Sequence, residues 1–223
     1  MDRKYYTEVK KDIMPSQSDP TMAKWTDWRK LNYDFYKKFD YTGKKVVNLG
    51  AGKGYFRELF KDSDYLTVDF YPYEGIDVVA DLIKPLPFDS NHFDFIILSN
   101  VLEHISEPEK LIKECHRILK DDGTLLITVP FFIKLHQQPY DFFRYTEYAL
   151  KNLLSAFEEI DIKKSGTLSD IHKGILENMF GLKSRLYKPV YWLVKFLTSF
   201  KVDHPNYPWG YEICAKKKNK FTS

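Results

Sequence analysis

Three closely spaced glycines form the first group of residues that could position a ligand. Residues 50–54 read G-A-G-K-G and directly follow a short apolar run. Glycine has no Cβ, so the chain can turn tightly and a bound group can lie against the main chain. A pyrophosphate-binding dinucleotide loop would need another glycine where this chain has Tyr55. The loop therefore favours a nucleoside ligand without a pyrophosphate.

Two carboxylates end the next two apolar runs. Asp69 follows residues 65–68, and Asp81 follows residues 77–80 and precedes Leu82. An acid at the end of the second strand of a nucleotide-binding sheet can accept hydrogen bonds from both ribose hydroxyls. Asp81 and Leu82 would suit an adenine amino group and ring face, although a strand-end acid is equally often part of a turn. Together with the glycine loop, these residues indicate a nucleoside site.

Two histidines are candidates for a general base. His136 lies in the segment 129–146, which leaves a predicted strand at the ligand edge of the sheet, and His104 follows the strand before it. Imidazole titrates near neutral pH, which suits proton removal from an acceptor. The alternatives are that His104 caps or packs a helix and that His136 makes a loop hydrogen bond. No carboxylate or histidine cluster has metal-ligand spacing, so no metal site is expected.

The segment after His136 also contains candidate substrate-binding residues. Tyr140, Asp141 and Arg144 lie in a pattern of Pro-x-Asp-x-x-Arg-x-Thr. An acceptor atom must be held in line with the group that is transferred, and a hydroxyl acceptor also needs a base to remove its proton. This segment overhangs the place where an acceptor would sit. The alternative is that Asp141 and Arg144 form a structural pair that shapes the loop.

Short β-rich runs alternate with helical patterns over residues 43–166, which predicts a mostly parallel sheet covered by helices. Several runs are continuously apolar, as expected for strands buried on both faces. The predicted strands are residues 46–49, 65–68, 77–80, 93–98, 124–129, 158–163 and 211–215. The expected fold is a three-layer α/β/α sandwich with a seven-stranded sheet whose last strand is antiparallel.

Helix signals occur at several places between these strands. A capping box is expected at residues 106–109, starting a helix that includes Leu119 and ends at 121–123. Thr146 is the expected N-cap of a second helix that extends toward Phe157. A further helix is expected directly after the glycine loop, and residues 1–42 carry aromatic residues at helical spacing.

With these motifs in order, the chain resembles the class I S-adenosylmethionine-dependent methyltransferases, most closely the type 11 subgroup. The resemblance covers residues 46–166 and also rests on the segments F-D-F-I-I-L-S-N-V-L-E-H at 93–104 and G-T-L-L-I at 123–127. It implies a Rossmann-like fold and S-adenosylmethionine as cofactor. The cofactor-binding positions that it implies are Gly50, Ala51, Gly52, Gly54, Tyr55, Asp69, Phe70, Asp81, Leu82 and Asn100.

The resemblance also assigns parts of the cofactor to these positions. The glycine loop would lie under the methionine part, Asp69 on the ribose and Phe70 against the adenine. Asn100 would face the sulfonium and the substrate. One position departs from the family, because Asn48 stands where an Asp or Glu is usual. An amide keeps a hydrogen-bonding group but lacks the charge that complements the cofactor's ammonium.

The segment around His136 resembles methyltransferases linked to polysaccharide and glycan assembly. This likeness predicts an oxygen of a sugar or glycan as the methyl acceptor. A small-molecule or lipid acceptor is the main alternative within the enzyme class. Two alternatives from other classes are a nicotinamide-dependent oxidoreductase, which Tyr55 disfavours, and a non-catalytic methyltransferase-like binding module, which Asn48 keeps open.

The expected domain organisation is an N-terminal helical arm at 1–42, a methyltransferase domain at 43–219 with a helical insertion at 167–208, and a tail at 220–223. The insertion is expected to act as a lid, a homodimer surface or, through residues 186–200, a peripheral membrane contact where aromatic and basic residues occur together. Nucleic acid is not an expected partner, because the 34 basic residues are scattered and the net charge is only +3. Two cysteines without ligand or disulfide spacing favour the cytoplasm.

Overall fold

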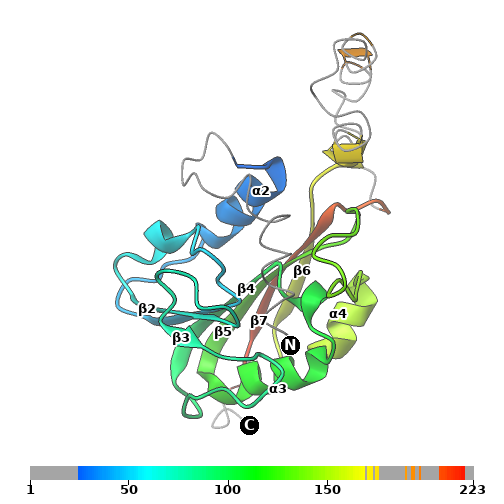
Figure 1. The fold of residues 1–223 in the computed structure, drawn as a ribbon. Helices are drawn as coiled ribbons and strands as arrows, with labels where there is room; N and C mark the ends of the chain where they lie inside the picture. Colours follow the sequence, from blue (N-terminus) through cyan, green and yellow to red (C-terminus); the bar gives the residue numbers. More distant parts are fainter. Residues whose placement is uncertain are drawn as a thin grey trace.

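The computed structural model describes residues 25–168, 170–172, 174, 175, 189, 192, 193, 196 and 206–218. In this part of the chain, seven strands form one sheet in the order β3-β2-β1-β4-β5-β7-β6 (Figure 1). The strands are β1 (Lys45–Leu49), β2 (Asp64–Asp69), β3 (Val78–Val79), β4 (Phe93–Ser99), β5 (Leu119–Pro130), β6 (Ile160–Ser165) and β7 (Gly210–Lys216). All seven expected strands are therefore confirmed.

The direction of the strands shows at which edge of the sheet a ligand would bind. The strands β1 to β5 pair in parallel, whereas β7 is antiparallel to both β5 and β6. The strand order reverses beside β1, which pairs with β2 on one side and β4 on the other. Open α/β sheets bind ligands outside the carboxyl ends of their strands at such a reversal. The glycine loop and Asn100 both leave strands at this edge.

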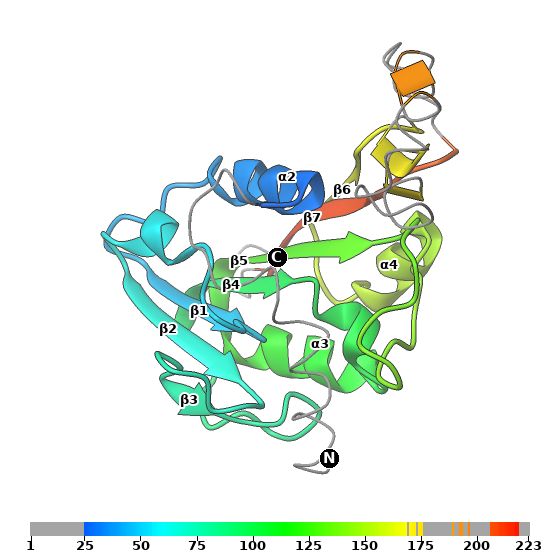
Figure 2. The same ribbon diagram turned by 45° about the horizontal axis from the view of Figure 1, so that its top comes forward.

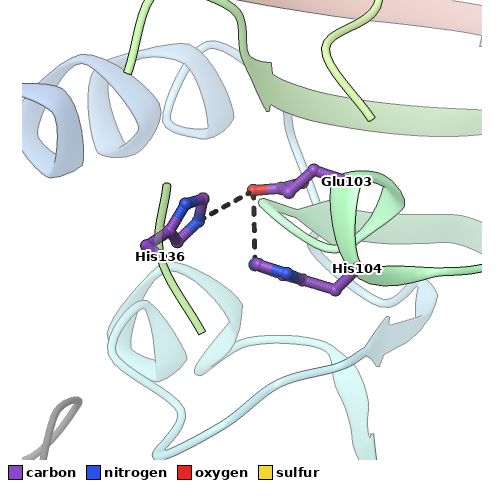
Figure 3. A group of neighbouring side chains, drawn as sticks. All are labelled: Glu103, His104 and His136. Carbon is purple, nitrogen blue, oxygen red and sulfur yellow. Dashed lines mark ion pairs between the residues drawn. The ribbon is translucent and has the colours of Figure 1, made fainter. Parts of the chain in front are cut away.

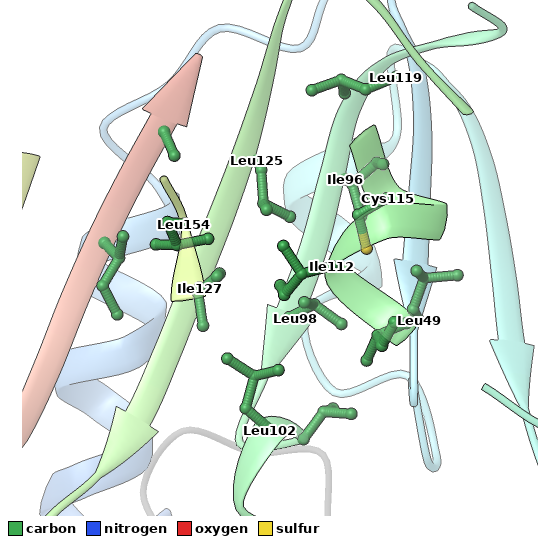
Figure 4. Close-up of a cluster of buried hydrophobic side chains, with 14 of the residues drawn as sticks. Leu49, Ile96, Leu98, Leu102, Ile112, Cys115, Leu119, Leu125, Ile127 and Leu154 are labelled. Carbon is green, nitrogen blue, oxygen red and sulfur yellow. The ribbon is translucent and has the colours of Figure 1, made fainter. Parts of the chain in front are cut away.

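Side chains of the central strands alternate between two apolar cores. The helices are α2 (Asp27–Tyr36), α3 (Pro108–Ile118) and α4 (Glu147–Leu153). Ile96 and Leu98 of β4 belong to the core that α3 and α4 cover (Figure 4), whereas Ile97 belongs to the core beneath α2. Figure 2 shows α2 and α3 on opposite sides of the sheet. This arrangement confirms the predicted three-layer sandwich.

The helix α3 starts one residue later and ends earlier than the sequence predicts. Its N-cap position is Glu107, and no side chain caps it, so the expected capping box at Ser106 is wrong. Pro108 is the first helical residue because its fixed φ and missing N–H suit that position. Leu119 has extended backbone and pairs with Phe93 in the sheet. The helix therefore ends before the apolar pattern ends, because Leu119 pairs with β4.

Two other helix predictions are only partly right. Thr146 is the N-cap of α4, since its Oγ1 accepts a hydrogen bond from Ala149 N at 3.2 Å, but the helix ends at Leu153 rather than near Phe157. After the glycine loop there is a single 3₁₀ turn, η2 (Arg57–Phe60), in place of the expected α-helix. The Phe60 carbonyl accepts from Ser63 N, which closes the turn before an α-helical ladder can continue.

The helix α2 lies within the predicted N-terminal arm and packs on the sheet. Trp25, Trp28 and Phe35 are buried, as expected from their helical spacing. The Tyr36 hydroxyl, also buried, forms a hydrogen bond of 2.9 Å with Thr128 Oγ1 of β5. This bond and the surrounding aromatic contacts anchor α2 against the central strands.

Parts of the predicted organisation lie outside the described residues. These parts are residues 1–24 of the arm, the tail, and most of the insertion at 167–208, so the roles expected for the insertion stay predictions. Among the helices that the structure describes, none has the length and apolarity that a membrane crossing requires.

Candidate active site

The glycine loop lies at the carboxyl end of β1 and is held against β2. Gly50 N and Ala51 N both donate to the Val68 carbonyl, at 2.8 and 3.0 Å. Gly50 has a φ of +74°, and a Cβ there would lie 2.6 Å from Cγ2 of Val101. Gly52 has a φ of +55°, and no atom lies within 4 Å of the position its Cβ would take. The loop is therefore fixed at Gly50 and leaves room for a ligand at Gly52.

Asp69 stands at the end of β2 and is anchored by the backbone. Its Oδ2 accepts a hydrogen bond from Gly52 N at 2.8 Å, and its Oδ1 accepts one from Tyr71 N at 2.9 Å. Burial raises the pKa of Asp69, while the backbone hydrogen bonds oppose that rise. The Phe70 N–H is a third backbone donor to this carboxylate. A carboxylate has about four lone-pair sites, so acceptor capacity remains for a hydroxyl group. The geometry suits recognition of a diol.

These elements border a cavity of about 450 Å³. This volume falls within the roughly 300–1,000 Å³ of small-molecule sites. The predicted site residues that line it are Gly50, Ala51, Gly52, Tyr55, Asp69, Phe70, Asp81, Leu82, Asn100, His104, His136 and Tyr140. Gly54, Asp141 and Arg144 are not among the residues that line it.

Two asparagines contribute polar groups to the cavity wall. Asn48 Nδ2 donates to the Tyr65 hydroxyl at 2.9 Å, but its buried Oδ1 has no hydrogen-bond partner among the described residues. Asn100 has a φ of +54°, and its Oδ1 accepts a hydrogen bond of 2.7 Å from Trp28 Nε1. The Asn48 oxygen is therefore ready to accept a hydrogen bond from a ligand, and the Asn100 side chain is already oriented by α2.

Glu103, His104 and His136 form a compact group that we name the Glu-His-His cluster (Figure 3). Glu103 and His104 belong to the 3₁₀ turn η3 (Leu102–His104) after β4, and His136 lies in the loop after β5. Glu103 Oε1 is 3.7 Å from His104 Nε2 and 3.8 Å from His136 Nε2. Burial lowers the pKa of His104, while the nearby Glu103 charge opposes that shift. The shift favours the uncharged form of the His104 ring.

Asp141 and Arg144 bind each other rather than facing the cavity. Arg144 donates to both carboxylate oxygens of Asp141, at 2.6 and 2.8 Å, and Asp141 Oδ2 also accepts from His136 N at 2.9 Å. These contacts hold the pKa of Asp141 at about 2 against the opposing effect of burial. The arrangement favours the structural pair over direct substrate binding, and its effect is to fix the position of His136.

Several cavity residues were not among the sequence-based candidates, including Glu103, Trp28, Arg29 and Tyr73. Glu103 was visible in the sequence as the residue before His104, but nothing there indicated a fully buried carboxylate. Trp28 is one of the aromatic residues at helical spacing in the N-terminal arm, a pattern that predicts packing. It packs on Trp209, with ring centroids 5.6 Å apart, and it also orients Asn100. Its helical spacing alone could reveal only the packing role.

Comparisons of the chain with known proteins indicate its family. A family model described as a methyltransferase domain matches residues 24–161. A demethylmenaquinone methyltransferase of Renibacterium salmoninarum is 28% identical over 146 residues, which cover 60% of this chain and 59% of that protein. A ubiquinone biosynthesis O-methyltransferase of Glaesserella parasuis is 30% identical over 112 residues, which cover 39% of this chain and 45% of that protein. The chain thus spans about half the length of these curated relatives.

A solved structure supports the fold. An S-adenosylmethionine-dependent methyltransferase from Archaeoglobus fulgidus matches with a TM-score of 0.63 and 18% identity, covering 96% of this chain and 100% of that one. At this level of identity the likeness concerns the fold alone.

Proposed function

The chain belongs to the class I S-adenosylmethionine-dependent methyltransferases, and from this membership we propose that it methylates a hydroxyl oxygen of a small-molecule acceptor. The observation that carries the proposal is a single cavity lined both by the glycine loop with Asp69 and by the Glu-His-His cluster. The first set suits a nucleoside with an amino-acid part, and the second suits removal of a hydroxyl proton. S-adenosylmethionine supplies an electrophilic methyl group when it is bound.

The residues at the glycine loop fit this cofactor. The buried Asn48 Oδ1, which lacks a partner among the described residues, offers a hydrogen bond to the ammonium group. Gly52 leaves open space beside the main chain, where the methionine part would lie. Asp69 would accept hydrogen bonds from the ribose hydroxyls, and Asp81 with Leu82 would contact the adenine.

The acceptor oxygen would be held near Asn100 and the Glu-His-His cluster. Its proton would leave toward the cluster, where the sequence-based hypothesis names His136 or His104 as the base. Positioning supplies most of the rate in an in-line displacement, so the loop that carries His136 and Tyr140 has to be rigid. The Phe142 N–H donates to the Glu103 carbonyl at 2.8 Å and anchors this loop. This hydrogen bond supports a positioning role for the loop.

The class of acceptor is inferred from the loop after β5 and from the relatives. The sequence predicts a sugar or glycan, but Asp141 and Arg144, two of its three expected substrate contacts, pair with each other. The two curated relatives carry names from quinone biosynthesis, and one is an O-methyltransferase. We therefore place a small hydroxylated molecule, such as a phenol, before a glycan.

Binding and transfer can be tested separately. Isothermal titration calorimetry should show S-adenosylmethionine and S-adenosylhomocysteine binding with micromolar affinity, and no binding of NAD. Transfer of a radiolabelled methyl group should then be measured against phenols, catechols, free sugars and nucleotide sugars. Binding without transfer to any hydroxyl compound would support a binding module instead. Binding of NAD alone would refute the proposal.

A further inference from the structure

We propose that Glu103, His104 and His136 bind a divalent transition-metal ion inside the cavity. The ion would be one that accepts mixed nitrogen and oxygen ligands, with Zn²⁺ as the reference case. Two imidazoles and one carboxylate are a donor set for such ions, whereas Mg²⁺ prefers oxygen ligands alone. The sequence gives no metal-ligand spacing, because His136 comes from a different strand end than Glu103 and His104.

The distances within the cluster are close to those of a metal site. One ligand atom from each residue can be chosen so that all three lie within 4.8 Å of one another. Glu103 Oε1 lies 3.7 and 3.8 Å from the two Nε2 atoms, and Figure 3 shows both rings directed at this oxygen. Zinc bonds of about 2.0–2.2 Å place neighbouring ligand atoms roughly 3–3.5 Å apart. Small side-chain shifts would therefore complete the site.

The second nitrogen of each imidazole faces a hydrogen-bond acceptor. His104 Nδ1 is 2.6 Å from the Tyr140 carbonyl oxygen, which can only accept, so Nδ1 carries the proton and Nε2 has a free lone pair. His136 Nδ1 lies 3.3 Å from Asp141 Oδ2 without a hydrogen bond between them, and Arg144 holds that carboxylate in place. Metal-binding histidines are usually oriented by such an acceptor at the other ring nitrogen. The loop therefore presents both Nε2 atoms as ligands.

The polar atoms of the cluster are buried without satisfactory partners. Glu103 is fully buried, and neither of its carboxylate oxygens has a hydrogen bond among the described residues. His104 Nε2 is in the same situation. A buried carboxylate that accepts no hydrogen bond destabilises the folded protein. The two imidazole nitrogens that face Glu103 present lone pairs rather than N–H groups, so they donate no hydrogen bond to it. A cation between the three groups would satisfy all of them at once.

The ion would give the cluster a chemical role in the proposed methyl transfer, and this part of the inference rests on the proposed function. Three protein ligands leave at least one coordination position for an acceptor hydroxyl, whose pKa the ion lowers. The hydroxyl proton would go to solvent water. The oxygen would then form its bond to the methyl carbon as the carbon–sulfur bond breaks, which leaves S-adenosylhomocysteine. In this scheme, His104 and His136 are ligands rather than bases.

Metal binding can be measured without activity. The chelator-treated protein should bind one Zn²⁺ per chain in calorimetry, and Co²⁺ should give the visible absorption of a four- or five-coordinate site. Glu103→Gln and His136→Gln should each weaken Zn²⁺ binding at least tenfold. His172→Gln is the matched control, because His172 is exposed and lies in a different segment, and it should bind like the wild type.

Binding of S-adenosylhomocysteine to each variant reports whether its fold is intact and tests the proposed function independently. Loss of Zn²⁺ binding in the cluster variants with unchanged S-adenosylhomocysteine binding supports the metal site. Zn²⁺ binding that is absent in the wild type, or equal in all variants, overturns it even if S-adenosylhomocysteine binds. If a cluster variant unfolds, His104→Asn, which keeps a polar side chain of smaller size, replaces it in the same comparison.

Discussion

At the scale of single residues, Asp69 and Asn48 carry the recognition of the cofactor in our proposal. Backbone N–H groups, among them those of Gly52 and Tyr71, fix Asp69, which retains acceptor capacity toward the cavity. Asn48 is fixed on one side only, by the Tyr65 hydroxyl. We therefore predict opposite effects on ligand affinity when the charge of Asp69 is removed and when a charge is added at Asn48.

Removing the charge of Asp69 should weaken cofactor binding. Asp69→Asn keeps the shape of the side chain but halves its acceptor capacity, so we expect S-adenosylhomocysteine to bind about tenfold or more weakly, or roughly 1.4 kcal/mol. Isothermal titration calorimetry would measure the effect. Asp64→Asn, at the exposed start of the same strand, is the control and should bind normally. Unchanged affinity of Asp69→Asn would show that the ribose is not bound there.

Adding a charge at Asn48 should strengthen binding of the ligand's ammonium group. In Asn48→Asp, one oxygen can accept from the Tyr65 hydroxyl while the other faces the cavity, so we expect affinity to rise about three- to tenfold. The free protein should become less stable, because the added carboxylate is buried. Calorimetry and urea unfolding would measure the two effects on the same sample. Weaker binding in this variant would place the ammonium elsewhere.

At the scale of elements, α3 binds the segment that connects β3 to β4. Glu114 and Arg117 of α3 form a two-point ion pair, with distances of 2.9 and 2.7 Å. Glu114 also accepts from Leu86 N, and Arg117 donates to the Leu86 and Phe88 carbonyls. The pair thus satisfies backbone groups of a segment that follows Asp81 and Leu82.

Breaking this pair should reduce stability in a pH-dependent way. The Arg117 hydrogen bonds lower the pKa of Glu114 from its usual 4.5. A lowered folded-state pKa stabilises the protein above the unfolded-state value, and this stabilisation is lost as the pH falls through the folded-state value. Glu114→Gln should therefore cost about 1 kcal/mol at neutral pH, with a difference from wild type that shrinks below about pH 4.5.

Urea unfolding at pH 7 and at several values below 4.5 would measure this difference. Glu74→Gln is the control, because Glu74 is exposed and lies outside α3. A cost for Glu114→Gln that stays constant down to the lowest pH would mean that the carboxylate charge does not contribute.

At the scale of the whole molecule, the cavity draws residues from α2, the glycine loop, the ends of β2 and β4, and the loop after β5. A ligand that contacts all of these segments should stabilise the folded chain as a unit. At a concentration of about 100 times its dissociation constant, S-adenosylhomocysteine should add about 2.7 kcal/mol, which raises the Tm by roughly 5–10 °C. NAD at equal concentration should give no shift, and Asp69→Asn should show a smaller one. Thermal scanning calorimetry would test this, and an equal shift with NAD would contradict it.

The sequence by itself determined the sheet and half of the site. Apolar runs with glycines or acids at their ends predict the seven strands, the glycine loop and the position of Asp69. The reason is local, because a buried strand and a tight turn each require particular residue types within a few positions. Helix ends were less well determined. Leu119 fits the apolar pattern of α3, yet it pairs with Phe93, since sheet pairing outweighed the local preference.

Only the tertiary structure decided how the half of the cavity that contains the Glu-His-His cluster is assembled. Glu103 and His104 follow β4, while His136 follows β5, and α3 separates these two segments in the chain. The parallel register that pairs Ser99 with Thr128 brings the two strand ends together, and the Phe142–Glu103 backbone hydrogen bond closes the loop over them. Local sequence carries no signal for such a convergence, because it depends on the register between strands that are distant in sequence.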